Sequence, residues 1–410
     1  MRRVLLLAPA AGYGHADFAR AAARLGAEVV VCADYCPKLA PDWGLAPLMS
    51  VPFDQPEIAV PRILGALAQP PDAVIASDDH GTLLAARLQA ALGLRGNPPE
   101  AVAALTDKLA FRRLQARHGL PHPAFCLLAD DADAAAAARS VGYPLVVKAR
   151  RLNASRGVIR ADDPAALVRA VARVRRIQAR ADREGRGLGV LLERYLPGTE
   201  IALEGVLLRG RLQVLALFDK PDPLVGPYFE ETIYVTPSRL PAATQDAIAA
   251  AVARACAAAG LVEGPLHAEA RVNDAGVWLL EIAPRGIGGL CGRSLTTPLG
   301  MSSAEIVLRH ALDLPLPAGR AGRAAGVMMI PVPRRGVLRA VGGVEDARAV
   351  PGIDAVEISA VPGQIVAPAP EGASYLGFLF SAAATPARAE AALRAAHAHL
   401  RIDIQPLLAS

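Results

Sequence analysis

A short hairpin pattern near residue 270 constrains this chain more than any other feature. Two apolar runs flank an Asn-Asp-Ala-Gly segment at 273–276, and each run carries one carboxylate, Glu269 or Glu281. Such a turn between apolar runs predicts two antiparallel strands. Acidic residues are poor strand formers, so two of them on neighbouring strands, with Arg285 close behind, suggest a divalent-metal site. The alternative is that both carboxylates lie on the solvated face of an amphipathic hairpin.

Composition narrows the class of protein. The 410 residues are 53% hydrophobic, which is enough for two or three domains with buried cores. The net charge of +5 is spread thinly, and aromatic residues make up only 4% of the chain. Without a basic run or interleaved aromatic residues, nucleic-acid binding is not expected. No stretch reaches the roughly 18 apolar residues of a membrane span, so no membrane association is expected.

The cysteines and the N-terminus indicate the compartment. Five scattered cysteines form neither a Cys-x-x-Cys motif nor a zinc-ligand pattern. Their odd number predicts free thiols in a reducing cytosol, and hence a cytoplasmic protein. The N-terminal apolar run is short and interrupted by Pro9, which favours a first β-strand over a signal peptide.

The first part of the chain, residues 1–105, predicts a parallel α/β domain, because strands alternate with helices. Strands are expected at 3–8, 28–32 and 73–76, and helices at 18–25 and 83–92. The Gly-Tyr-Gly turn after the first strand is not a dinucleotide-binding motif, since Asp17 takes the third glycine position. Asp78 and Asp79 follow the third strand, where such sheets bind ligands, and are interpreted as partners of an ammonium group or as helix caps.

Two α+β blocks follow. The central domain, 106–311, is expected to begin with a helix capped by Thr106 or Asp107 and to end with the hairpin. A spacer rich in Pro, Gly and Ala leads to a small C-terminal α+β domain at 321–410, with a final helix over 385–400. We see no internal repeat.

Two further segments carry chemistry. Lys148 ends the buried strand 144–148 and runs into the polar, small-residue loop 149–157. Backbone N–H groups and a lysine in this arrangement can cradle phosphates, although a strand-end lysine can also simply reach solvent. The segment 192–200 contains Glu193 and Glu200 and suits an interdomain hinge that offers backbone groups to an adenine edge. Its alternative is a surface loop.

In chain order these motifs resemble the ATP-grasp ligases, and within them the L-amino acid ligase branch. The series is Asp107-Lys108, the strand ending in Lys148, the small-residue loop, Leu192–Glu200, His267-Ala-Glu269 and Glu281-Ile-Ala-Pro-Arg285. The similarity extends to the C-terminal block Tyr375–Ser381, which resembles the extra domain of amino acid ligases. Many ATP-grasp enzymes have Asn two residues after the second metal carboxylate, where this chain has Ala283.

The resemblance implies an ATP-grasp fold and a role for each matched residue. Lys108 and Lys148 would contact the ATP phosphates, under a loop containing Ser155, Arg156 and Gly157. Glu193 and Leu196 would meet adenine, and Glu200 the ribose. Glu269 and Glu281 would hold Mg²⁺, or Mn²⁺ in its place. Arg285 would stabilise the anionic intermediate, with His267 beside the metal strand.

The implied reaction joins a carboxylate to an amine through an acyl phosphate and releases ADP and phosphate. Small-molecule substrates, amino acids in particular, are expected to contact Lys220, Tyr228, Glu230, Gly288 and Arg293. The chain could act as a homodimer. The alternatives are an ATP-grasp carboxylase or purine-pathway type of ligase, and a nucleotide-binding protein without catalysis.

Overall fold

A computed structural model describes residues 1–9, 13–34, 47–181, 188–316, 322–372 and 374–407. The chain begins with a four-stranded parallel sheet in the order β3-β2-β1-β4. Its strands are β1 (Arg3–Ala8), β2 (Glu28–Ala33), β3 (Pro47–Ser50) and β4 (Ala73–Ala76), and its helices are α1 (His15–Leu25), α2 (Pro56–Ala66) and α3 (Asp79–Leu92). The predicted parallel α/β arrangement is confirmed. Because β1 and β4 are parallel neighbours, the segments after them emerge at one edge, where α/β sheets bind ligands.

Two helices, α4 (Pro99–Leu105) and α5 (Lys108–Arg117), lead from this sheet to the next part of the chain. Asp107 caps α5, because its side chain accepts hydrogen bonds from the backbone N–H groups of Leu109 and Ala110 at 2.9 and 3.3 Å. The cap fixes the start of α5, so that Lys108 occupies its first turn.

A small antiparallel sheet in the order β5-β8-β6-β7 follows. Its strands are β5 (Phe125–Leu128), β6 (Leu145–Lys148), β7 (Val158–Ala161) and β8 (Val190–Arg194), and its helices are α6 (Ala134–Val141) and α7 (Pro164–Ala181). The alternate residues Leu145 and Val147 pack against Val171 and Val174 of α7. This packing holds β6 rigidly, with Lys148 at its end.

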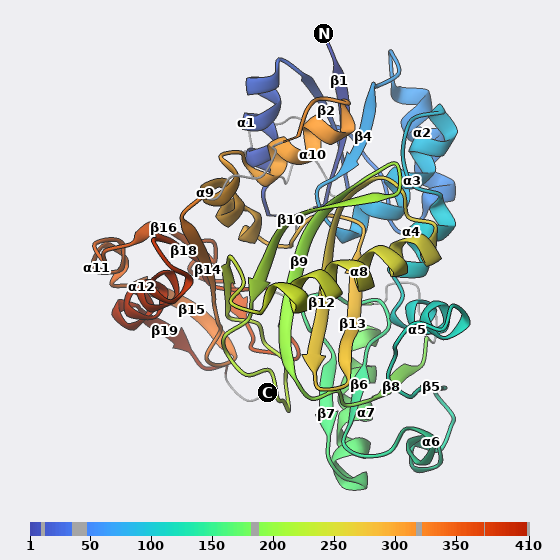
Figure 1. Ribbon diagram of the computed structural model, residues 1–410, viewed down its shortest axis with the longest axis vertical. Coiled ribbons are helices and arrows are strands. Elements are labelled where there is room, and N and C mark those ends of the chain that lie inside the picture. Colours follow the sequence, from blue (N-terminus) through green and yellow to red (C-terminus); the bar gives the residue numbers. More distant parts are fainter. Residues whose placement is uncertain (10–12, 35–46, 182–187, 317–321, 373, 408–410) are drawn as a thin grey trace.

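The largest sheet has eight antiparallel strands in the order β13-β12-β9-β10-β11-β14-β18-β16. They are β9 (Thr199–Leu208), β10 (Arg211–Asp219), β11 (Ile233–Thr236), β12 (Gly264–Asn273), β13 (Gly276–Ala283), β14 (Ala324–Ile330), β16 (Ile353–Ile358) and β18 (Gly377–Ala383). Helix α8 (Ala242–Ala259) crosses the face of its first strands (Figure 1). Since β11 pairs with β14, the sheet continues across the spacer, and the domain boundaries near residues 105 and 311–321 stay predictions.

The hairpin predicted from sequence is confirmed. Asn273 pairs with Gly276 across the turn, and Glu269 lies directly opposite Glu281. Directly opposed residues of an antiparallel pair share one face of the sheet. The two carboxylates therefore project to the same side.

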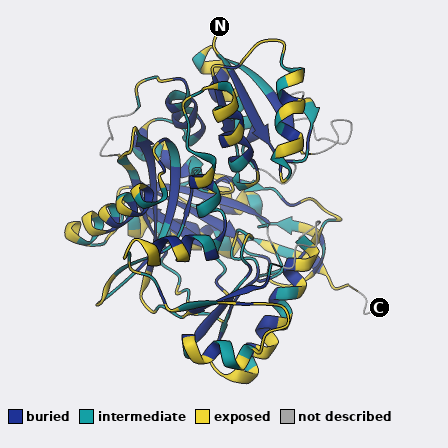
Figure 2. Ribbon diagram, turned by 90° about the vertical axis from the view of Figure 1, so that its right-hand side faces the viewer, coloured by how far each residue is buried: buried dark blue, intermediate teal, exposed yellow. Residues whose placement is uncertain are grey.

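The remaining described elements include four α-helices and a small third antiparallel sheet. Helices α9 (Thr296–Leu299) and α10 (Ser303–Ala311) follow the hairpin, and α10 packs its Val307 and Leu308 against Val4 of β1. A three-stranded sheet of β15 (Gly336–Gly342), β17 (Ile365–Val366) and β19 (Arg401–Gln405) lies near the C-terminus with α11 (Val344–Arg348) and α12 (Pro386–His399). Central strands are buried and helices turn exposed residues outward (Figure 2). No described helix is long and apolar enough to cross a membrane.

Candidate active site

One cavity of about 680 Å³ is lined by residues from three of the four sheets. Its wall includes residues from the N-terminal sheet, the small sheet and the large sheet. Thirteen of the residues predicted for the site line this cavity, and ten of them were predicted for nucleotide or metal binding or, as His267, beside the metal strand: Lys108, Lys148, Ser155, Arg156, Glu193, Leu196, Glu200, His267, Glu269 and Glu281. Arg285, Gly288 and Arg293 line it as well. The fold thus gathers most of a site that is scattered over nearly 200 residues of sequence.

At one end of the cavity, Lys148 is fixed by a buried charge network. Its Nζ lies 2.5 Å from a carboxylate oxygen of Glu193, whose other oxygen lies 2.8 Å from Nε of Arg112. Burial lowers the pKa of Lys148 despite the charge of Glu193. Burial alone would raise the pKa of Glu193, but the charges of Arg112 and Lys148 lower it. The Glu193 side chain is thus paired with two cations, and its contact with adenine stays a prediction.

An apolar slot adjoins this network. Val146, Val158 and Phe229 pack together as a buried cluster, each also lining the cavity. They come from β6, β7 and the loop before β11. A slot of this kind, walled by apolar side chains and bordered by hinge backbone, suits a flat heteroaromatic ring.

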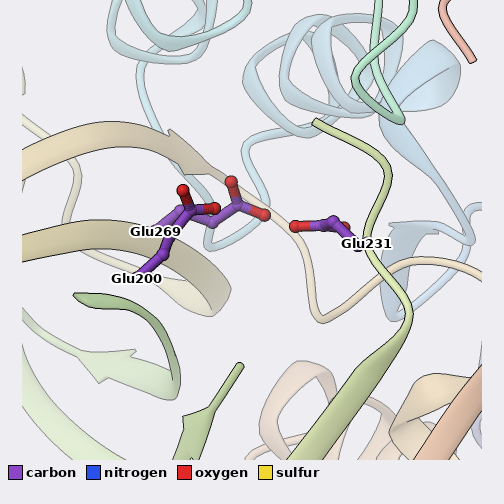
Figure 3. A group of neighbouring side chains, drawn as sticks. All are labelled: Glu200, Glu231 and Glu269. Atoms are coloured by element: carbon purple, nitrogen blue, oxygen red, sulfur yellow. The ribbon is translucent and has the colours of Figure 1, made fainter. Parts of the chain in front are cut away.

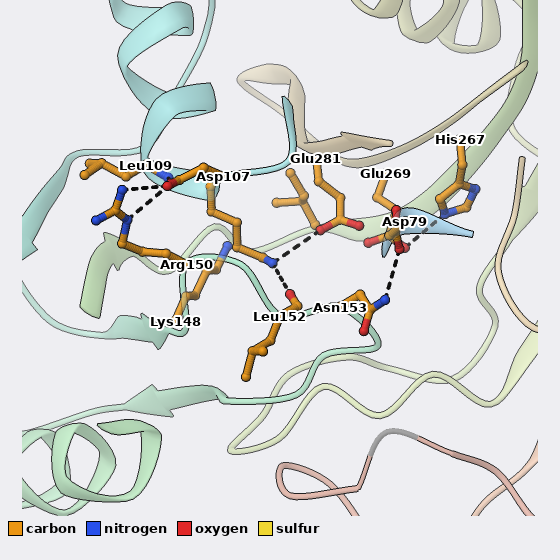
Figure 4. Close-up of polar contacts among 12 residues, drawn as sticks. Asp79, Asp107, Leu109, Lys148, Arg150, Leu152, Asn153, His267, Glu269 and Glu281 are labelled. Carbon is orange, nitrogen blue, oxygen red and sulfur yellow. Dashed lines mark hydrogen bonds and ion pairs between the residues drawn. The ribbon is translucent and has the colours of Figure 1, made fainter. Parts of the chain in front are cut away.

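The loop between β6 and β7 lies over the cavity and is held from several sides (Figure 4). Lys108 Nζ donates to the carbonyl oxygen of Leu152 at 2.5 Å, and Asn153 donates to Asp79 at 3.1 Å. The N–H of Gly157 donates to the carbonyl oxygen of Pro370 at 2.9 Å, so this predicted nucleotide contact faces the C-terminal region. Together these contacts tie the loop to α5, to α3 and to the C-terminal part of the chain.

Glu269 and Glu281 form the acidic part of the site. They face each other across β12 and β13, and both line the cavity. Lys108 Nζ lies 3.9 Å from Glu281. Two carboxylates on paired strands supply hard oxygen ligands with little freedom to move. The donor set therefore fits Mg²⁺, which binds through one or two carboxylates plus substrate phosphates.

A second acidic group surrounds Lys220. Carboxylate oxygens of Glu200, Glu231 and Glu269 lie within 4.8 Å of one another (Figure 3). Lys220 Nζ contacts all three, at 2.9 Å from Glu200 and 3.3 Å from Glu269. The lysine thus supplies the cation for this group, and Glu269 belongs both to it and to the opposed pair. Glu200, predicted to bind ribose, also accepts from Arg271 Nε at 2.9 Å.

Lys220 and the nearby Glu231 have unusual electrostatics. Lys220 is 6% exposed. Burial would lower its pKa, but the charge of Glu200, followed by those of Glu231 and Glu269, raises it well above the usual value. Burial, together with the charge of Glu269, raises the pKa of the Glu231 carboxyl to about 7. Glu231 is therefore protonated more easily than an ordinary carboxyl group.

His267 sits on β12 between two carboxylates. Its Nδ1 lies 2.5 Å from Glu204 and its Nε2 3.2 Å from Glu269. Burial alone would lower the pKa of this imidazole, but the hydrogen bond and charge of Glu204, with a smaller effect of Glu269, raise it to about 9. At neutral pH His267 is a buried cation that holds Glu269 in place. This arrangement suits a role of His267 in positioning Glu269.

We expect the stability of the ligand-free protein to fall as pH rises through 9. The folded pKa of His267, about 9, exceeds its unfolded value. Protonated His267 therefore contributes its full stabilisation of the fold below pH 6.5 and loses it as pH rises through 9. This contribution to the free energy of unfolding is up to about 3 kcal/mol. Urea unfolding between pH 7.5 and 9.5 should show this loss in wild type and not in His267→Asn. The exposed His118→Asn is the control that should keep it; a slope shared by all three proteins would contradict the assignment.

Arg285 follows β13 and is paired with Asp79 at the start of α3. Its Nε and Nη2 donate to the two oxygens of Asp79 at 2.8 and 2.6 Å, and Nη1 donates to the carbonyl oxygen of Gly286 at 2.8 Å. Burial would lower the pKa of Arg285, but Asp79 raises it. Asp78, in contrast, is the cap of α3, accepting from the N–H of His80 at 2.8 Å. The two acidic residues after β4 thus have different partners.

The five predicted substrate contacts separate into two sets. Gly288 and Arg293 line the cavity, and Arg293 also bonds Asp17 at 2.9 Å and contacts Glu357. Lys220 is buried and contacts the carboxylates of the second acidic group. The ring centroid of Tyr228 lies 5.0 Å from the guanidinium carbon of Arg173 on α7. None of Lys220, Tyr228 and Glu230 belongs to the cavity wall as the described residues define it. Substrate contact by these three stays a prediction.

Sequence analysis missed several residues of the site. Three aromatic rings line the cavity: the centroids of Tyr13 and Tyr375 lie 5.5 and 6.2 Å from that of Phe378. Glu204 and Arg112 orient His267 and Glu193 from buried positions. An acidic residue in an otherwise apolar strand was the available signal for Glu204.

Comparison with known proteins gives the class. Residues 141–294 match a family model described as the ATP-grasp domain. Residues 328–405 match the model of L-amino acid ligase C-terminal domain 2. The chain belongs to the ATP-grasp superfamily. Within it, the chain carries the C-terminal domain of the L-amino acid ligases, as its sequence motifs predicted.

Individual relatives agree with this. The crystal structure of L-amino acid ligase from Bacillus licheniformis superposes with a TM-score of 0.81 at 25% identity and covers 99% of both chains. Carnosine synthase 1 of Gallus gallus is 34% identical over 286 residues, 66% of this chain. D-alanine–D-alanine ligase of Stutzerimonas stutzeri (strain A1501) is 29% identical over 52% of this chain and 66% of that protein. The chain spans only 30% of the length of the chicken carnosine synthase.

Proposed function

We propose that this protein is an ATP-dependent carboxylate–amine ligase that acts on small molecules, amino acids among them. The observation that carries the proposal is the content of a single cavity. Glu269 and Glu281 lie opposite each other there, and Lys108, Lys148 and Arg285 line the same cavity. This is the charge pattern expected of a site that transfers a phosphoryl group to a carboxylate. The similarity to amino acid, carnosine and D-alanine ligases supports the substrate class.

In this proposal ATP binds with adenine between Val146, Val158 and Phe229, against the hinge that contains Leu196. Lys108 and Lys148 would contact its phosphates beneath the loop containing Ser155 and Arg156. Glu269 and Glu281 would hold Mg²⁺, which when bound neutralises phosphate charge. Glu200 faces ribose only if it exchanges one of its present contacts with Lys220 and Arg271.

The chemistry proceeds in two steps. A substrate carboxylate oxygen takes the γ-phosphoryl group, which gives an acyl phosphate and ADP. An amine then attacks the acyl carbon, phosphate leaves, the nitrogen loses a proton, and an amide remains. Arg285 would stabilise the oxyanion of the tetrahedral intermediate. His267 would keep Glu269 oriented. We place the enzyme in the cytosol, where ATP is present and where the free thiols of Cys32, Cys126, Cys256 and Cys291 would stay reduced.

A substrate-matrix assay tests this function. Purified protein, ATP and Mg²⁺ are incubated with pairs of amino acids and amines, ADP release is recorded, and products are identified by mass spectrometry. We expect ADP and phosphate release that depends on both partners, and a product whose mass is their sum less one water. Release of AMP, or carboxylation of one substrate from bicarbonate, would replace this proposal with another reaction. Tight ATP binding without turnover in any pair would indicate a non-catalytic nucleotide-binding protein.

A further inference from the structure

The carboxylate of Asp79 joins three parts of the chain that are far apart in sequence. Asp79 opens α3 in the N-terminal region. Its two oxygens accept from Nε and Nη2 of Arg285 at 2.8 and 2.6 Å. One of them also accepts from the amide of Asn153 at 3.1 Å, as Figure 4 shows. Arg285 follows the hairpin, and Asn153 lies in the loop over the cavity. One side chain therefore links the loop to the arginine.

The fold of the N-terminal sheet does not require this side chain. The side chain of Asp78 caps α3, so the helix does not depend on the Asp79 side chain for its N-terminal cap. Burial would raise the pKa of Asp79, but the charge of Arg285 lowers it, and the carboxylate stays ionised. All its side-chain partners belong to the candidate active site.

The pairing fixes the direction of the guanidinium group. Arginine carries five N–H donors in a rigid plane, and in Arg285 three of them are directed to Asp79 and to the Gly286 carbonyl. A bidentate pair leaves little freedom to rotate that plane. The donors left on Nη1 and Nη2 therefore have a set orientation at the cavity wall, which is where a developing oxyanion needs them.

We propose that Asp79 is a positioning residue that couples the loop at 149–157 to Arg285. The proposal rests on the proposed ligase function. With the loop over the cavity, Asn153 completes the set of hydrogen bonds on Asp79, and Arg285 is then oriented toward an acyl phosphate shielded from water. When the contact is lost, the loop opens more often and water reaches the acyl phosphate. Its hydrolysis yields phosphate and the free carboxylate, so ADP forms without amide.

The test uses four variants of the full chain: Asp79→Asn, Asn153→Ala, the double variant, and the control Asp72→Asn. Asp72 is an exposed aspartate of the same region whose partner is the N–H of Arg3. Two readouts are recorded. One is the rate of trypsin cleavage after Arg151 and Arg156 in the loop, with and without ATP and Mg²⁺. The other is the ratio of ADP to amide product.

We expect Asp79→Asn and Asn153→Ala each to raise loop cleavage about tenfold, the size of a lost hydrogen bond to a charged group. Each should also raise the ratio of ADP to amide. The double variant should cleave little faster than Asp79→Asn, because both changes break the same contact. Asp79→Asn should further lower kcat more than Asn153→Ala, since it alone frees Arg285. Asp72→Asn should behave as wild type.

Unchanged loop cleavage in Asp79→Asn, or effects of the single variants that multiply in the double variant, would overturn the proposal. If Asp79→Asn fails to fold, Asn153→Ala decides alone, because it leaves the ion pair with Arg285 in place; unchanged cleavage in it then overturns the coupling. Proteolysis needs no turnover. A wild-type protein that forms no ADP would refute the ligase function, while the cleavage rates would still test the contact.

Discussion

Glu281→Gln should lower the rate of amide formation about a thousandfold and leave the fold intact. A bound metal ion contributes several kcal/mol of charge stabilisation in such reactions, and a loss of about 4 kcal/mol corresponds to this factor. The stability cost should be small. The Glu281 side chain is 31% exposed, and its nearest cation, Lys108 Nζ, lies 3.9 Å away. Such half-exposed ion pairs contribute about 1 kcal/mol or less.

Glu281 is a cleaner target than its partner on β12. Glu269 also contacts Lys220 at 3.3 Å and His267 at 3.2 Å, so Glu269→Gln would disturb two buried cations besides the proposed metal site. In Glu281→Gln, activity should fall strongly while the stability of the fold should hardly change. The comparison therefore tests the metal role without confusing it with unfolding.

The measurement is ADP release under saturating substrates, together with thermal unfolding with and without ATP and Mg²⁺. The variant should unfold within a few degrees of wild type when no ligand is added, and the stabilisation by ATP and Mg²⁺ should largely disappear. Glu345, whose side chain is exposed on α11, provides the matched control. Glu345→Gln should retain both the wild-type rate of ADP release and the stabilisation by ATP and Mg²⁺. Activity within tenfold of wild type in Glu281→Gln would rule out a metal role for this carboxylate.

Local patterns sufficed to predict the fold class. Strands that alternate with helices predicted the parallel sheet, and the turn at 273–276 predicted the hairpin. The structure confirms both predictions. Hydrophobic periodicity and turn residues determine structure within a few residues, so they can be read from the sequence alone. The short strands β15, β17 and β19 gave no comparable signal, since β17 has two residues and all three pair over long separations.

The candidate site could be predicted as a set of residues but not as a network. Lysines and carboxylates at strand ends were visible in the sequence. The pairing of Arg285 with Asp79, 206 residues away, was not, because it depends on how the N-terminal sheet meets the hairpin. Likewise, nothing near Lys220 in the sequence indicates that three distant carboxylates enclose it. Its predicted substrate role came from its place in a polar segment, whereas its burial is set by tertiary packing.

Lys220→Met should destabilise the ligand-free protein by about 3–5 kcal/mol at pH 8, the range measured for breaking a buried ion pair. Methionine matches the length of the lysine but leaves the carboxylates without their shared cation. Glu200 keeps Arg271 at 2.9 Å, and Glu269 keeps His267 at 3.2 Å. Glu231 alone loses its charged partner, and most of the cost should fall on it.

This cost should depend on pH in a defined direction. The folded pKa of Glu231, already about 7 in wild type, should rise further without Lys220. A carboxyl group whose pKa is higher in the folded than in the unfolded protein stabilises the fold at pH values below its unfolded pKa. This stabilisation is lost as pH rises through the folded pKa. The deficit of Lys220→Met should therefore shrink on going from pH 8 to pH 5.5, by up to about 1.4 kcal/mol per pH unit.

Urea unfolding at both pH values measures this, with Lys220→Met, Lys220→Met/Glu231→Gln and the exposed Arg62→Met compared with wild type. Arg62→Met removes the same charge from the surface and should cost little at either pH. Glu231→Gln should restore most of the stability lost at pH 8, because it removes the unpaired charge. An equal deficit at pH 5.5 and pH 8, without rescue by Glu231→Gln, would mean that Lys220 stabilises the fold by packing and not as the counter-ion of this acidic group.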